Sequence, residues 1–268
     1  LMLCCVAPDA AEQKVVNKLY SEKGEAGEQV ITQLEDGSYS ASLNMSWNNR
    51  VVTIKETLQV DEKGVPIAFS ASGTSAFGAP IAEQFSLLDG VARWSGNKDD
   101  GMLQTAETRY YVPADEAGAS SHVLMKALLA SPTQSVDLFP GGTARLDALK
   151  TVTVTNGNNS KEVTLYAISG LAFNPSFGWF DKDGHYFAQD FSGFMRVIRD
   201  GFSLDNFAEL TKIQKQAEND YLADIAKHLS HSYSTVLLQG GSVVDVLTRK
   251  VLRNTDVLLQ NGKIMAVG

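Results

Sequence analysis

The chain of 268 residues contains only two cysteines, Cys4 and Cys5, and they are neighbours. Adjacent cysteines are poorly placed for an ordinary disulfide bond, because a bridged pair needs a larger separation and facing Cβ atoms. The sequence therefore predicts a body without its own disulfide crosslink and without a cysteine-ligated zinc site.

Basic clusters are missing as well. Lysine and arginine number 23 against 31 aspartates and glutamates, which gives a formal net charge of -8. Nucleic acids and anionic membranes attract clustered positive charge, and the sequence has no basic run. The composition therefore predicts no nucleic-acid partner. Hydrophobic residues make up 44% of the chain, which is enough for a proper core.

Long apolar runs and two catalytic motifs are also absent. No stretch after the first residues approaches the ~20 apolar residues that a helix needs to cross a bilayer, so the sequence predicts no transmembrane span. The chain has neither a Gly-x-Ser-x-Gly nucleophile turn nor a glycine-rich phosphate loop ending in Lys-Ser/Thr. Hydrolase and nucleotidase functions based on those motifs are therefore excluded.

The first residues are similar to the end of an export signal. They read Leu1-Met2-Leu3-Cys4-Cys5-Val6-Ala7, with Leu1 three residues before Cys4, as in a bacterial lipoprotein cleavage site. Cys4 and Cys5 are therefore the candidates for lipidation. Cys5-Val6-Ala7 also suits an ordinary signal peptidase, and an apolar start to the first helix is a third alternative. We interpret residues 1–12 as a signal or lipoprotein remnant and expect an exported protein, periplasmic or anchored to a membrane by lipid.

Residues 13–200 have the pattern of an antiparallel β domain. A short helix is expected first, at about residues 10–19, from the spacing of Ala11, Val15, Val16 and Leu19. β-rich runs separated by short polar loops follow at residues 29–34, 39–47, 51–60, 66–72, 84–88, 92–95 and 105–112. Short loops require antiparallel neighbours, because parallel strands need a long crossover. The sequence therefore predicts a meander of six or seven strands.

A helix and further strands follow the meander. Ser120 and Ser121 are typical of a helix N-terminus, and the helix is expected to end before Pro132. Its apolar face, which is predicted to cover the sheet, consists of Val123, Leu124, Ala127 and Leu128. Strands are then predicted at residues 150–155 and 161–168, and at residues 178–180 paired with 185–188.

Residues 201–232 contain the longest helical pattern in the chain, beginning at Ser203. Apolar side chains recur at three- and four-residue steps, at Phe207, Leu210, Ile213, Ala217, Tyr221, Ile225 and Leu229. Charged residues occupy the opposite face. The pattern predicts a long amphipathic helix that connects the β-rich region to the strands that follow it.

The last residues, 233–268, alternate short apolar runs with turn signals. Asn261-Gly262 stands between two such runs, and this dipeptide suits a type I′ turn because both central residues need φ > 0. The sequence therefore predicts a tight terminal hairpin.

Residues 234–268 also resemble the start of the metal-dependent amidohydrolases. The resemblance is carried by Leu238-Gln239-Gly240-Gly241, Val244-Asp245, Asn254-x-Asp256-Val257 and Asn261-Gly262-Lys263-Ile264-x-x-Val267-Gly268. It implies the opening strands of a small β-sandwich, followed by a (β/α)8 barrel with a His-x-His metal motif. It also implies that a divalent metal, usually zinc, activates water for attack on an amide, cyclic amide or related C–N bond of a small-molecule or peptide-like substrate. A generic meander of three or four strands is the alternative.

No His-x-His motif follows in this sequence, so we assign no catalytic or metal-binding residue. The expectation is an N-terminal part of an exported amidohydrolase that is inactive by itself and holds no cofactor. The second hypothesis is a non-enzymatic envelope protein, in which the sheet of residues 29–188 binds an apolar ligand or another protein.

Four histidines and one acidic turn are candidates for other chemistry. His228 and His231 stand three apart near the end of the long helix, but two ligands are too few for zinc. Asp181-x-Asp183-Gly184 is only partly similar to a calcium loop, and a hairpin turn explains it better. His122 and His185 have no recognisable catalytic partner, so we interpret both as structural.

A dense group of aromatic residues lies between residues 173 and 202. It contains Phe173, Phe177, Trp179, Phe180, Tyr186, Phe187, Phe191, Phe194 and Phe202. Such rings can line an apolar pocket. We favour a role in filling the seam between sheet and helix, because large rings dominate core burial.

Together these patterns predict an α+β fold. Its expected parts are a mainly antiparallel β-sheet meander with covering helices, a long C-terminal helix, and a short terminal set of strands from an incomplete β-sandwich. The expected boundaries are 1–12, 13–200, 201–232 and 233–268.

Overall fold

The computed structural model describes residues 13–191 and 195–268. Cys4 and Cys5, the lipidation candidates, and Phe194 of the aromatic group lie outside the described residues, so export stays a prediction. The chain divides into two compact units, Leu1–Glu218 and Asn219–Gly268. Each unit is described by itself.

Strands dominate the structure, so the predicted α+β class was wrong. The described residues contain one sheet of 15 strands, one sheet of three strands and only two helices, α1 (Ala119–Ala130) and α2 (Leu204–Leu229). The fold class is mainly β. A strand occupies the place of the helix expected at about residues 10–19. The large sheet bends around α1, whereas several covering helices were expected.

The first strand, β1 (Gln13–Ser21), shows why the helix prediction failed. Asn17 and Leu19 are buried with exposed fractions of 0% and 4%. The buried positions therefore alternate with period two, and a polar residue occupies one of them. β1 pairs antiparallel with β2 (Gly24–Gln33) on one side and with β15 (Met195–Arg199) on the other. Hydrogen bonds along both edges outweigh the weak local preference for a helix.

The first arm of the large sheet is a meander in which neighbouring strands are joined by hairpins, with the order β8-β7-β6-β5-β4-β3-β2-β1. After β2 come β3 (Tyr39–Trp47), β4 (Arg50–Val60), β5 (Pro66–Thr74), β6 (Pro80–Leu88), β7 (Val91–Ser95) and β8 (Asp100–Gln104). All these pairs are antiparallel. The strands predicted between residues 29 and 95 are found close to their predicted positions.

The second arm continues from β1 with the order β15-β14-β13-β12-β11-β10-β9. Its strands are β9 (Tyr110–Tyr111), β10 (Ser135–Phe139), β11 (Thr143–Asn156), β12 (Asn159–Ser169), β13 (Ser176–Asp181), β14 (Tyr186–Phe191) and β15. The predicted strand at residues 105–112 was wrong, because only Tyr110 and Tyr111 are extended and they pair in parallel with β10. That partner is distant in sequence and left no local signal.

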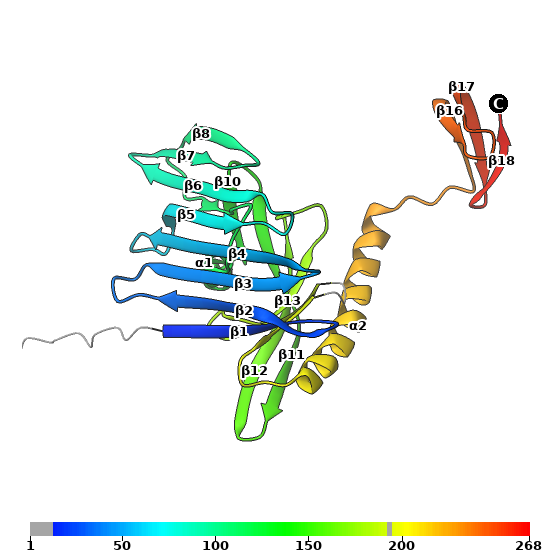
Figure 1. Ribbon diagram of the computed structural model, residues 1–268. Helices are drawn as coiled ribbons and strands as arrows, with labels where there is room; N and C mark the ends of the chain where they lie inside the picture. Colours follow the sequence, from blue (N-terminus) through cyan, green and yellow to red (C-terminus); the bar gives the residue numbers. More distant parts are fainter. Residues whose placement is uncertain (1–12, 192–194) are drawn as a thin grey trace, which may run out of the picture. The chain divides into compact units, whose positions relative to one another are not determined.

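The two arms share one core around α1. Buried side chains from β2 to β7 form a single cluster with side chains from α1, β9, β10, β11 and β13. The helix contacts β3 and β4 of the first arm and β10 and β11 of the second arm. Figure 1 shows α1 behind β3 and β4, on the face that is turned toward the second arm. The sheet therefore bends around the helix.

The other face of the second arm packs against the beginning of α2. Trp179 and Phe180 are adjacent on β13, but Trp179 belongs to the cluster beneath α2 and Phe180 to the cluster around α1. Phe207 and Leu210 of α2 are buried in the cluster beneath the helix, and the indole Nε1 of Trp179 donates to Gln214 Oε1 at 3.1 Å. The predicted long helix is confirmed, and it begins one residue after Ser203.

The second unit contains an antiparallel sheet of β16 (Thr235–Asp245), β17 (Lys250–Gln260) and β18 (Lys263–Val267). Asn261 and Gly262 have φ of 48° and 74°, so the predicted type I′ geometry of the terminal hairpin is confirmed. β16 continues through Gly240-Gly241 as one strand, with a shift in its register there.

Candidate functional site

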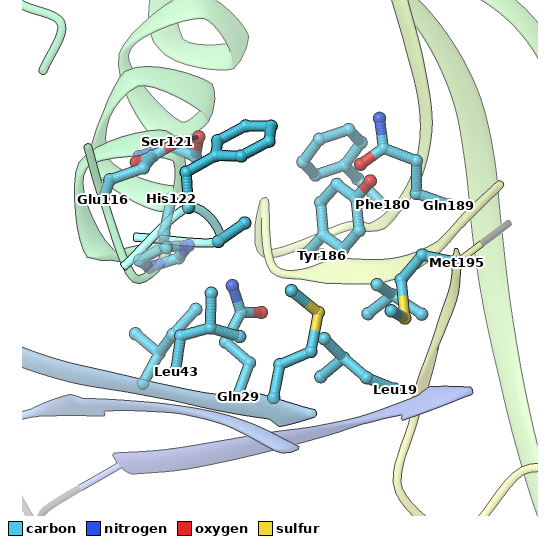
Figure 2. A pocket seen from close by; sticks show the side chains of 16 residues that line it. Leu19, Gln29, Leu43, Glu116, Ser121, His122, Phe180, Tyr186, Gln189 and Met195 are labelled. Carbon is cyan, nitrogen blue, oxygen red and sulfur yellow. Dashed lines mark hydrogen bonds between the residues drawn. The ribbon is translucent and has the colours of Figure 1, made fainter. Parts of the chain in front are cut away.

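A cavity of about 540 Å³ lies in the first unit, between the first three strands, the N-terminal end of α1 and the strands β13 to β15. Its walls are mostly aliphatic, methionine and aromatic side chains, as Figure 2 shows. The lining residues are Leu19, Gln29, Ile31, Leu43, Met45, Ala76, Phe77, Glu116, Gly118, Ser121, His122, Phe180, Tyr186, Gln189, Met195 and Val197.

The apolar wall follows from the two-residue period of the strands. Leu43 and Met45 on β3 point to the same face because they stand two residues apart, and so do Met195 and Val197 on β15. Leu19 of β1 pairs directly with Val197 across the junction of the two arms. The cavity therefore lies where the arms meet and where the concave face is not filled by α1.

The position of α1 beside this cavity is fixed by Glu56, a carboxylate in the apolar core. Glu56 on β4 is 1% exposed. Its Oε2 accepts the backbone N–H groups of Ala117, Gly118 and Ala119 at 2.6, 3.0 and 3.3 Å, and its Oε1 accepts the N–H and hydroxyl of Ser120 at 2.8 and 2.7 Å. The first N–H groups of a helix have no partner within the helix, and Glu56 satisfies them.

Glu83 holds the segment just before α1 in the same way. It lies on β6, is 4% exposed, and accepts the Tyr111 hydroxyl at 2.7 Å. The backbone N–H groups of Ala114 and Asp115 donate to the same carboxylate at 2.9 and 3.0 Å. Two strands of the first arm thus position residues 111–120, which form one wall of the cavity.

Glu116 is the acidic side chain of the cavity wall. Its Oε2 accepts the Ser121 backbone N–H at 2.9 Å, and its Oε1 accepts the Ser121 hydroxyl. Removal from water, and then the negative charge of the nearby Glu56, raise the pKa of Glu116 to about 7. Near neutral pH this group therefore exchanges a proton beside a mostly apolar cavity wall.

His122 lies one residue further along α1 and is 4% exposed. Its Nδ1 is 3.1 Å from the Gly184 carbonyl oxygen, so Nδ1 carries the proton that is donated to that oxygen. Burial and then the neighbouring His185 lower the pKa of His122 to about 4, which leaves a neutral ring at pH 7. The two rings stack with centroids 4.2 Å apart. The two histidines that the sequence left as isolated residues therefore lie together.

The acidic turn after β13 is built as a hairpin. Asp181 is 2% exposed, and its Oδ1 accepts the backbone N–H groups of Asp183 and His185 at 3.1 and 2.9 Å. Its Oδ2 lies 3.2 Å from Lys161 Nζ and 3.4 Å from Arg199 Nη1. Burial alone would raise the pKa of Asp181, but hydrogen bonds from His185 and the Arg199 charge hold it well below its usual range.

Metal binding at this turn is disfavoured. Side-chain ligand atoms of Asp181, Asp183 and His185 lie within 4.8 Å of one another. The Asp181 carboxylate is nevertheless already neutralised by two cationic side chains and shared with backbone donors, so the hairpin interpretation explains it fully. His228 and His231 at the end of α2 are exposed, and His228 lies 3.9 Å from Asp224. Among the described residues, these side chains do not form a group of three ligand atoms close enough to share a metal ion.

Comparison with known proteins shows similarity to solved structures only. No protein-family model matches the chain, and no curated protein matches it. Among solved structures it is similar to the β-barrel-like protein of domain of unknown function DUF1849 from Brucella abortus, with a TM-score of 0.43 and 13% sequence identity, over 69% of this chain and 94% of that chain.

These findings overturn the amidohydrolase interpretation. The family, its hydrolase activity and the incomplete β-sandwich were inferred from residues 234–268 alone, and no comparison returns an amidohydrolase. The zinc ion and the amide substrate followed from that resemblance and have no other support. The amidohydrolase prediction was wrong, whereas the zinc cofactor stays an untested prediction.

Turn geometry explains the residues that suggested the amidohydrolases. Gly240 has φ of 65°, and its N–H donates to Asp256 Oδ1 at 2.8 Å. Asp245 accepts the N–H groups of Leu247 and Thr248 in the turn between β16 and β17. A small three-stranded sheet needs glycine, aspartate and asparagine at these places whatever its function.

Sequence reasoning missed the three glutamates around the start of α1, although a local signal exists for two of them. Glu56 falls on the apolar face of β4 at the period of Val52, Ile54 and Leu58. Glu83 occupies the equivalent place between Ile81 and Phe85 on β6. A carboxylate within an apolar stripe indicates a buried polar contact, whereas nothing in the sequence places Glu116 beside the cavity.

Two further outcomes concern the aromatic group and membrane spanning. Of the nine aromatic residues between positions 173 and 202, Phe180 and Tyr186 line the cavity, whereas Phe177, Trp179, Phe187 and Phe202 belong to the seam beneath α2. Both interpretations of the group therefore hold for different members.

In the described part of the chain, neither helix has the length and apolarity that a membrane-spanning helix requires.

Proposed function

We propose that the first unit binds an apolar small molecule in the cavity beside α1. The observation that carries this proposal is the cavity itself, which has a volume of about 540 Å³ and walls dominated by apolar side chains. Small-molecule sites are typically concave, mostly apolar and about 300–1,000 Å³ in volume, with a few polar groups that set the orientation of the ligand.

The lining side chains suit a flexible apolar guest. Met45 on β3 and Met195 on β15 both line the cavity, and methionine adapts its shape because the side chain is unbranched and polarizable. Phe180 and Tyr186 pack edge to face with their centroids 4.9 Å apart and provide a rigid aromatic wall. The cavity wall therefore combines adaptable methionine side chains with rigid aromatic rings.

Binding of a neutral fluorescent probe tests the proposal. We expect N-phenyl-1-naphthylamine to bind the purified protein with increased fluorescence and a 1:1 stoichiometry, because the probe is apolar and small. Leu43→Trp places a larger side chain in the cavity and is expected to weaken binding at least ~10-fold, since the indole ring occupies space that the guest needs. Fluorescence titration measures the dissociation constant of the probe for the unsubstituted protein and for the variant.

The matched control is Leu88→Trp. Leu88 is 68% exposed at the end of β6 and does not line the cavity. The same substitution there is expected to leave probe binding unchanged. Equal weakening by both variants, or no saturable probe binding by the unsubstituted protein, would contradict the proposed function.

A further inference from the structure

The charge of the cavity wall limits which head group its ligand carries. Among the described residues that line the cavity there is one acidic side chain, Glu116, and no lysine or arginine. The neutral His122 ring and the Tyr186 phenol add no positive charge near pH 7. A ligand with a carboxylate or phosphate in this cavity would therefore meet a negative group and no cationic lining side chain, which costs free energy. The Arg50 guanidinium lies behind the lining residues, over the Phe77 ring and bonded to the Ala76 carbonyl.

The helix N-terminus does not change this conclusion. A free helix N-terminus favours anions because its first N–H groups point outward without partners. Here the N–H groups of residues 117–120 donate to Glu56, and that of Ser121 donates to Glu116. The start of α1 is already occupied by two carboxylates of the protein itself, so it offers no donor to an anionic ligand.

Glu116 retains capacity to accept further hydrogen bonds. Each of its oxygens accepts one hydrogen bond from Ser121, and each carboxylate oxygen has a second lone pair. Ser121 is exposed, whereas Leu19 and Leu43 lie on the opposite wall in Figure 2. The cavity thus has an accessible acceptor at one side and an apolar interior facing it.

We propose that the cavity takes amphiphilic amines, with the apolar chain among the side chains of β1, β3 and β15 and the ammonium group on the Glu116 carboxylate. This inference rests on the proposed function, because it names the class of ligand for the same cavity. Its physical basis is a charge-assisted hydrogen bond that is stronger than a neutral one in a site of low polarity.

Three probes with the same chain and different head groups test the inference. Dodecylamine, dodecanol and dodecanoate are titrated below their aggregation concentrations against bound N-phenyl-1-naphthylamine at pH 8, where Glu116 is largely ionised because its pKa is about 7. We expect dodecylamine to displace the probe at a concentration at least ~10-fold lower than dodecanoate, a difference of about 1.4 kcal/mol. Dodecanol should fall between them.

Glu116→Gln separates the role of the charge from that of the cavity. The variant is expected to lose the preference for dodecylamine over dodecanol and to keep its affinity for dodecanol within about twofold, because the amide has a similar size and no charge. Glu162→Gln removes an exposed carboxylate on β12 that does not line the cavity, and it should leave all three affinities unchanged. Unchanged dodecanol binding also shows that the substituted protein is folded.

The unsubstituted protein provides a second measurement if Glu116→Gln does not fold. The titratable groups around Glu116 are Glu56 on β4, Glu83 on β6, His122 on α1 and Tyr186 on β14. Dodecylamine affinity is expected to rise from pH 6 to pH 8 as Glu116 loses its proton, while dodecanol affinity stays constant.

The outcomes distinguish the two proposals. If none of the probes binds, the proposed function fails. If all three bind equally, or if dodecanoate binds best, the cavity is a binding site and the inferred head group is wrong. A dodecylamine preference that persists in Glu116→Gln also overturns the inference.

Discussion

Glu56 is a charged residue whose burial is compensated entirely by hydrogen bonds to the start of α1. No cation is involved among its hydrogen-bond partners, which are four backbone N–H groups and one hydroxyl. Such an arrangement ties a residue of β4 to a helix that begins more than sixty residues later in the chain. Its loss would affect both the core and the wall of the cavity.

We expect Glu56→Ala to lower the free energy of unfolding by about 3 kcal/mol or more, because several buried N–H groups lose their only acceptor at about 1–3 kcal/mol each. Glu56→Gln keeps one acceptor oxygen and should cost less. Urea denaturation followed by circular dichroism measures the change. The control, Glu62→Gln in the exposed turn after β4, should change the free energy of unfolding by no more than about 0.5 kcal/mol. An equal loss of stability in Glu56→Ala and Glu62→Gln would contradict the role assigned to Glu56.

His122 makes stability depend on pH in the acidic range. Its pKa is about 4 in the folded protein against 6.5 for an unperturbed histidine. Between these values the unfolded chain binds the proton and the folded protein does not, so stability is lost as the pH falls from 6.5 to 4. We expect a loss of about 1–2 kcal/mol at pH 5 from this residue.

Comparison of His122→Gln with the unsubstituted protein measures this effect, because glutamine also donates to the Gly184 carbonyl and does not titrate. Lowering the pH from 7 to 5 should cost the variant about 1–2 kcal/mol less stability than it costs the unsubstituted protein. His228→Gln, which removes an exposed histidine of α2, should keep the full pH dependence. Glu116 contributes a trend of opposite sign between pH 4.5 and 7, because its raised pKa favours the folded state at low pH, and this trend is common to both variants.

At the scale of single elements, the sequence predicted those whose partners are close in the chain. The strands of the first arm pair with their nearest neighbours, so alternation and turn residues locate β3 to β7. The amphipathic period of α2 was equally clear. Strands with long-range partners left no such signal. β1, which pairs with β15, was predicted as a helix, and β9, which pairs with β10, was predicted as a longer strand.

The candidate site was less predictable than the elements for the same reason. Leu19, Leu43 and Val197 come from three strands, two of which are separated by more than 150 residues. Their apolar character was visible in the sequence, but a core position and a cavity position have the same residue types. The empty space arises from the curvature of the sheet and the placement of α1, and neither can be derived from a local period.

At the scale of the whole molecule, the cavity belongs to the first compact unit alone. All its lining residues lie between Leu19 and Val197, and the unit ends at Glu218 within α2. The two apolar side chains of α2 that are buried in the seam beneath it, Phe207 and Leu210, also precede this boundary. The described residues of the cavity wall and of the seam beneath α2 therefore all precede the boundary of the unit.

We expect a chain that ends at Glu218 to keep its fold and its affinity for N-phenyl-1-naphthylamine within about twofold. A chain that ends at Phe202 loses Phe207 and Leu210, exposes the apolar face of Trp179 and Phe187, and should be destabilised by at least about 3 kcal/mol, since each large buried side chain contributes about 1.5–3 kcal/mol. Thermal unfolding and probe titration of the two truncated proteins, compared with the full chain, measure the difference. Loss of probe binding on truncation at Glu218 would mean that the second unit contributes to the site, whereas equal stability of the two truncated proteins would show that the start of α2 is dispensable to the core.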